Sequence, residues 1–113
     1  MRKSFIAAAI ALGAVLASSG VVLAYETGIA VIHPWVKVGR KICFEDHYHY
    51  GSGSGPTQKQ AQADAINSWE WPTGLEYGSS WGDYRLAVGK SMKCTRSGAV
   101  WSCDTQARPC LQD

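Results

Sequence analysis

The chain has 113 residues, of which 46% are hydrophobic and 18% charged, and its formal net charge is +2. This length suits one domain with a limited core. All nine acidic residues follow position 24, whereas Arg2 and Lys3 precede it, so residues 25–113 are formally neutral. A neutral domain excludes the broad electrostatic footprint of proteins that bind nucleic acid or anionic membranes.

The first 24 residues have the pattern of a secretory signal peptide. Arg2 and Lys3 form a short positive start, residues 5–23 form an uncharged apolar run, and Ala24 closes a plausible cleavage site. The run approaches the length of a spanning helix, but serine and glycine residues interrupt it. We therefore predict cleavage after Ala24, export to the periplasm or outside the cell, and no membrane span afterwards.

The next segment predicts an arm and then a strand. Residues 25–34 have weak periodicity, and we expect a mobile N-terminal arm there, followed by one domain over residues 35–113. From Val36 to Tyr50, apolar and aromatic side chains occupy even positions, which is typical of a half-buried strand. The run Gly51-Ser-Gly-Ser-Gly55 has the composition of a flexible connector.

A helix is predicted after the connector. Thr57 and Gln60 have the spacing of a capping box, and Ala61, Ala65, Ile66 and Trp69 share one face of the helix that follows. Pro72 should end or kink this helix. A second short turn should then stop at Gly78.

Two strands complete the domain, one on each side of a turn at Gly98-Ala99. A two-residue turn there places Cys94 opposite Cys103 and Met92 opposite Thr105, and it gives both strands a common apolar face. The predicted fold class is therefore α+β. It is a small β-α-β-β domain with a three-stranded sheet and one helix packed on one face.

Four cysteines allow three pairings. The hairpin register favours a Cys94–Cys103 disulfide, which leaves Cys43 to pair with Cys110. A right-handed crossover brings the start of the first strand to the same end of the sheet as the finish of the third, which supports that second pair. Cys43 has the parity of the polar face, so this pair needs a local bend. The alternative is Cys94–Cys110 with Cys43–Cys103.

The sharpest chemical motif is His47-Tyr48-His49. Side chains two residues apart on a strand point to the same side, and Glu45 continues that line. Imidazole and carboxylate ligands suit Cu, Ni or Zn. A solvated polar strand face explains the same residues without a metal, and both interpretations stay open.

A second candidate site is aromatic. The rings Trp71, Tyr77, Trp81 and Tyr84 fall around the proline- and glycine-rich segment between the helix and the hairpin. Exposed there, they could bind a partner protein or stack on a sugar. The alternative is that they fill the space between the end of the helix and the sheet.

The C-terminal half resembles a known pattern. Trp69, Tyr77-Gly78, Trp81, Ala87, Cys94, Trp101-x-Cys103 and Ala107-Arg108-Pro109-Cys110 are similar to residues of small uncharacterised exported proteins of alphaproteobacteria. The resemblance covers residues 61–110. It implies an exported protein with a disulfide framework, and it implies no activity.

These observations favour a small, non-enzymatic module of the periplasm or cell envelope. We expect a monomer without a cofactor, which binds an envelope protein or a glycan through residues 71–84. The first alternative is a periplasmic transition-metal binder that uses His47, His49 and Glu45. The second is a small secreted hydrolase or an inhibitor of one, for which the sequence offers no catalytic set.

Overall fold

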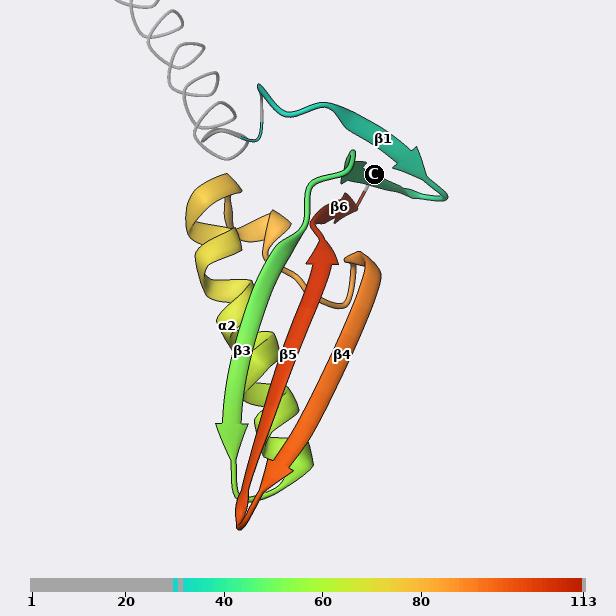
Figure 1. Ribbon diagram of the computed structural model, residues 1–113. Coiled ribbons are helices and arrows are strands. Elements are labelled where there is room, and N and C mark those ends of the chain that lie inside the picture. The colour runs from blue at the N-terminus through green and yellow to red at the C-terminus, as the bar shows by residue number, and fades with distance from the viewer. Residues whose placement is uncertain (1–29, 31, 113) are drawn as a thin grey trace, which may run out of the picture.

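The computed structural model describes residues 30 and 32–112, and the predicted signal peptide lies outside that range. The main layer is an antiparallel sheet of β3 (His49–Gly55), β5 (Val100–Arg108) and β4 (Val88–Ser97), with β5 in the centre. Helix α2 (Gln58–Tyr77) lies along one face of this sheet (Figure 1). The predicted α+β arrangement, a three-stranded sheet with one helix, is confirmed. No helix in the described part of the chain is long and apolar enough to cross a membrane.

A second, smaller sheet caps one end of the main layer (Figure 1). It consists of β1 (Trp35–Val38), β2 (Lys41–Phe44) and β6 (Cys110–Gln112), with β2 in the centre. The sequence did not predict this sheet, because residues 36–50 were expected to form one strand with a bulge or a bend at Gly39-Arg40. In the structure these two residues form the turn between β1 and β2. The Arg108 guanidinium joins the two sheets by donating from Nη1 to the carbonyl of Phe44 at 3.0 Å.

The predicted strand over residues 36–50 is wrong because the chain bends between β2 and β3. Asp46 has a φ of 49°, a left-handed conformation that breaks the extended backbone. After the bend the inward face changes parity. Tyr50, expected to face the core, is 70% exposed, while Gly51 is buried.

The segment predicted as a flexible connector is strand β3 itself. A Cβ atom added to Gly51 would lie 2.2 Å from the backbone oxygen of Ala65, and one added to Gly53 would lie 2.2 Å from the nitrogen of Ala65. The helix therefore packs directly on the strand backbone, through a face that includes the fully buried Ala61 and Ala65. The glycines are required for this close approach rather than for flexibility.

Helix α2 begins as predicted and stops at Gly78 as predicted, but it is one helix where a helix and a second short turn were expected. The Thr57 hydroxyl accepts a hydrogen bond from the backbone N–H of Gln60 at 3.1 Å, and Gly78 caps the C-terminal end. Pro72 lies inside the helix, so the expectation that it could end the helix is wrong. An internal proline costs about 3 kcal/mol. Burial of Thr73 and Tyr77 in the turns that follow offsets this cost.

Both disulfides join the cysteines that the sequence predicted to pair. Cys94 and Cys103 lie opposite each other on β4 and β5, and Cys43 and Cys110 lie opposite each other on β2 and β6. The hairpin register, with Met92 opposite Thr105, is also confirmed. The bend that Cys43 needed is present, because β2 leaves the main layer and pairs in the second sheet.

The core consists of small residues around a few rings. Trp69, fully buried, donates from Nε1 to the carbonyls of His49 at 3.0 Å and Ala107 at 3.2 Å, and so connects the helix to both β3 and β5. Of the arm expected over residues 25–34, residues 25–29 and 31 lie outside the description. Ala30 is fully buried, and its carbonyl accepts a hydrogen bond from the Trp35 indole at 2.9 Å.

We predict that Gly53→Ala destabilises the domain by about 3 kcal/mol, because the new methyl group overpacks the contact with Ala65. Urea unfolding measures the change. Ser54→Ala is the matched control on the same strand, where the exposed side chain should change stability by less than about 0.5 kcal/mol. Equal effects of the two substitutions would contradict the close packing of helix on strand.

Candidate functional site

The bend at Asp46 turns His47 and His49 toward the end of α2. The Nε2 atom of His47 lies 2.6 Å from the Tyr77 hydroxyl oxygen, and the Nε2 atom of His49 lies 2.7 Å from the same oxygen. Tyr77 is fully buried, and both histidines are half-buried. Two imidazoles and one phenol therefore meet at a single point beneath the surface.

The number of protons constrains this arrangement. A tyrosine hydroxyl carries one hydrogen, so it can donate to at most one of the two histidines. At least one of His47 and His49 must then donate its own Nε2–H to the Tyr77 oxygen. The two short contacts thus require a defined set of ring protons.

His33 completes the group, which we call the His–Tyr cluster (His33, His47, His49 and Tyr77). Its ring centroid lies 4.7 Å from that of His47 and 5.2 Å from that of Tyr77. His33 could not be assigned to this group from the sequence, because 14 positions separate it from His47. The backbone N–H of His33 donates to the carbonyl of Ala30 at 3.2 Å, and Ala30 packs with Phe44 and Tyr77, which places His33 beside Tyr77.

The surroundings shift the ionisation of this cluster. Burial, followed by the neighbouring Glu76 carboxylate, raises the pKa of Tyr77 to about 12. Burial also lowers the pKa of His49, and the nearby His47 and His33 act in the same direction. Glu76, with Oε2 3.7 Å from Nε2 of His49, opposes that change. The cluster favours a protonated phenol and a neutral His49.

The predicted ligand set is only partly brought together. His47 and His49 converge, but the Tyr77 hydroxyl lies where their nitrogens meet, and Glu45 is exposed. Within residues 30 and 32–112, no three histidine, cysteine, aspartate or glutamate side chains are placed to share one metal ion. A metal held here would have to use the two histidines with Tyr77 or water.

The predicted aromatic surface over residues 71–84 is not formed as expected. Tyr77 is fully buried, and Trp81 is 2% exposed and stacks on Phe44 with ring centroids 4.2 Å apart. Tyr84 is half-buried, and its hydroxyl lies 2.7 Å from that of Thr105. Trp71 alone of the four predicted rings is largely exposed, at 64%.

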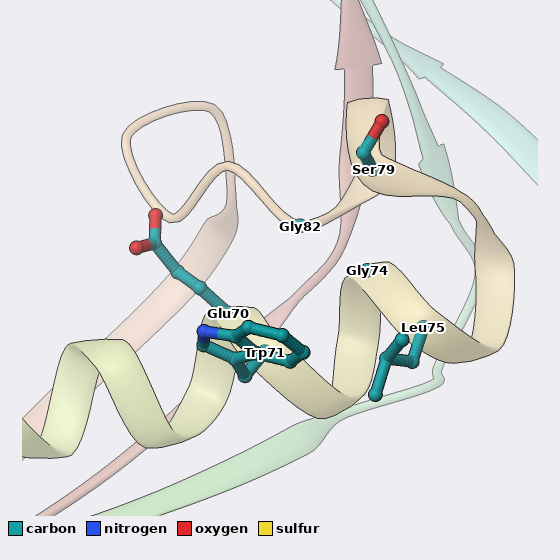
Figure 2. A pocket seen from close by; sticks show the side chains of 6 residues that line it. All are labelled: Glu70, Trp71, Gly74, Leu75, Ser79 and Gly82. Carbon is teal, nitrogen blue, oxygen red and sulfur yellow. The ribbon is translucent and has the colours of Figure 1, made fainter.

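Trp71 instead forms one wall of a pocket of about 340 Å³ (Figure 2). Leu75, one helical turn further on and 75% exposed, lies on the same side of α2. The whole lining consists of Glu70, Trp71, Gly74, Leu75, Ser79 and Gly82. None of the six is a histidine, so the pocket does not combine the Glu, His and Ser side chains that a small hydrolase would need.

The walls of this pocket are fixed by the backbone. A Cβ atom added to Gly82 would lie 3.0 Å from the Cα of Gly74, so the loop after the short helix η2 (Ser79–Trp81) packs closely on α2. The Glu70 carboxylate accepts a hydrogen bond from the backbone N–H of Tyr84 at 3.0 Å. Glu70 therefore braces this loop, and Trp71 and Leu75 supply the exposed apolar surface.

Comparison with known proteins found no match for this chain among protein-family models, curated proteins or solved structures.

We predict that the free energy of unfolding falls as the pH is lowered from about 7.5 to about 5. The pKa of His49 is lowered from 6.5 in the folded protein, so the unfolded chain binds protons more readily. The stabilisation is present above the unfolded pKa and is lost as the pH falls toward the folded pKa. One such group contributes a slope below about 1.4 kcal/mol per pH unit.

Urea unfolding at a series of pH values measures this slope. His49→Gln keeps a polar side chain without the titration, and it should flatten the dependence in this range. A slope that is the same in wild type and His49→Gln would contradict the role of His49.

Proposed function

We propose that this chain is an exported, non-enzymatic binding module of the periplasm or cell envelope. Its two disulfides and the signal-peptide pattern of residues 1–24 support export, because disulfides persist in oxidising compartments. The observation that carries the binding role is the pocket beside Trp71 and Leu75, two large apolar side chains left exposed on a rigid helix.

The pocket favours an apolar side chain of a partner polypeptide. Trp71 and Leu75 are mostly exposed. Gly74 and Gly82, which have no side chains, leave the space beside them open. Exposed aromatic and aliphatic side chains on a firm backbone serve as anchor points in protein interfaces. Glu70, at the rim, adds negative charge that suits a basic or neutral neighbour of that side chain.

The His–Tyr cluster fits a structural role in such a module. A buried phenol with a pKa of about 12 retains its proton near neutral pH, and two histidines already use its oxygen. These contacts hold the segment between β2 and β3 against the end of α2. Four of the residues that line the pocket belong to the same helix, so the cluster helps to fix the end of the helix on which the pocket is built.

The test is a selection of displayed random peptides on the immobilised wild-type protein, with counter-selection on Trp71→Ala. We expect the enriched peptides to share one apolar or aromatic anchor. Trp71→Ala and Leu75→Ala should each weaken their binding at least about thirtyfold, as expected of interface hot spots. Both side chains are exposed, so folding should be unaffected.

Val100→Ala is the matched control, because Val100 is an exposed apolar residue, 50% accessible, at the far hairpin. It should leave peptide binding unchanged. Failure to enrich any peptide dependent on Trp71 or Leu75 would contradict the proposal.

A second candidate function is transition-metal binding, and one observation favours it. The Nε2 atoms of His47 and His49 both approach a single oxygen, so the two rings are already aimed at a common point. Two imidazoles with a phenol or water suit Cu(II), Ni(II) or Zn(II). Glu45, which the sequence suggested as the third ligand, is exposed and has no place in this arrangement.

Isothermal titration with Cu(II), Ni(II) and Zn(II) tests this candidate. We expect one ion per chain at about micromolar affinity, lost in His47→Ala and His49→Ala. Tyr77→Phe removes the hydroxyl between the two nitrogens and tests whether it serves as a ligand or blocks the site. Glu45→Gln, the control, should change nothing. An affinity weaker than micromolar for all three ions would rule out this function.

A further inference from the structure

The face of the main sheet opposite α2 carries polar side chains in ordered cross-strand rows. The β3–β5 and β5–β4 registers place six of these residues in two rows of three, namely Tyr50, Gln106 and Ser91 in the first and Ser52, Asp104 and Lys93 in the second. A further row along the strands carries only hydroxyl groups. A solvated sheet face is ordinarily polar, so polarity alone assigns no ligand.

Two features distinguish this face from an ordinary solvated one. The first is Tyr50, an aromatic ring that is 70% exposed and stands among hydroxyl, amide and carboxylate groups. The second is a hollow of about 310 Å³, lined by Tyr50, Ser91, Lys93, Asp104, Thr105 and Gln106. A ring beside a hollow can stack on a flat apolar surface of a ligand.

An irregularity in β4 ends at Ser91, one of the residues that line this hollow. The pairing of β4 with β5 shifts between Val88 and Ser91. Gly89 within it has a φ of +63°, and a Cβ atom there would lie 3.0 Å from the Tyr48 hydroxyl. Glycine is favoured here by the left-handed conformation and by the close approach of the Tyr48 hydroxyl. Such bulges recur next to binding sites, where they redirect side chains.

The balance of charges on this face indicates which class of ligand it suits. Asp104 lies directly opposite Lys93, so the hollow has no net charge. The Ser52 hydroxyl donates to Oδ1 of Asp104 at 2.7 Å, which orients the carboxylate. The lining therefore offers directed hydrogen-bond donors and acceptors without an excess of either sign. This combination suits a neutral molecule with many hydroxyl groups and disfavours a polyanion.

We propose that this face binds a neutral oligosaccharide. One sugar ring stacks on Tyr50, and its hydroxyl groups form hydrogen bonds with Gln106, Asp104 and Lys93. Sugar rings combine a flat C–H surface with peripheral hydroxyls, which matches a tyrosine ring surrounded by polar groups. The site lies on the opposite face of the sheet from α2, so it is separate from the pocket beside Trp71 and extends the proposed function.

NMR titration of the ¹⁵N-labelled protein tests the proposal. The probes are neutral β-linked tetrasaccharides of glucose and of N-acetylglucosamine. We expect saturable amide shifts confined to residues 50–52, 91–93 and 104–106 with at least one of them. Tyr50→Ala should weaken binding about tenfold, and Tyr50→Phe, which keeps the ring, should retain it. The spectrum of each variant reports directly whether the fold is intact.

Trp71→Ala is the matched control, since it removes an exposed ring from the other layer of the molecule. It should leave oligosaccharide binding unchanged even if it abolishes peptide binding, so failure of the two proposals can be told apart. Shifts centred on residues 70–75, equal binding by wild type and Tyr50→Ala, or no saturable shift at about millimolar oligosaccharide would each overturn the proposal.

Discussion

The close packing of α2 on the backbone of β3 is the constraint on which the rest of the structure depends. Gly51 and Gly53 have no room for a side chain, and Ala61 and Ala65 meet them from the helix. This contact fixes the height of the helix above the sheet, and hydrogen bonds from Trp69 to β3 and β5 fix its position along the strands. Small residues in place of large ones leave a thin core, which suits a domain that also carries two disulfides.

The position of the helix in turn determines what its C-terminal turns can do. With Trp69 anchored between the strands, the buried side of the next two turns carries Thr73 and Tyr77, and Tyr77 packs against Phe44 of the second sheet. Tyr77 brings a hydroxyl into that space, and a buried hydroxyl without a partner is costly. His47 and His49 provide its partners, which the bend at Asp46 makes accessible. The Cys43–Cys110 disulfide then holds β2 against β6 close to this bend.

The sequence predicted the features that depend on local spacing. The Thr57 cap, the turn at Gly98 and the Cys94–Cys103 disulfide follow from offsets of a few residues or from strand parity, and all three are confirmed. The Cys43–Cys110 disulfide, also confirmed, followed instead from the two cysteines left over and from the handedness of the crossover. Prediction from the sequence failed where a residue's position depends on contacts with residues far away in the chain. Asp46 carries no glycine or proline signal for a break, and the glycine run looked flexible because its helical partner was not visible in the composition. The inclusion of His33 likewise depends on tertiary packing alone.

The sequence also could not predict which aromatic rings are buried and which are exposed. The exposed rings form the two surfaces proposed to bind ligands. Hydrophobicity cannot separate Tyr77 and Trp81, which the fold buries, from Trp71 and Tyr50, which it leaves exposed. Burying the first two completes the thin core. Both exposed rings stand on regular elements, one on α2 and one on β3, so little conformational freedom remains for a ligand to remove. Because the sheet separates them, a change at one ring should act independently of the other.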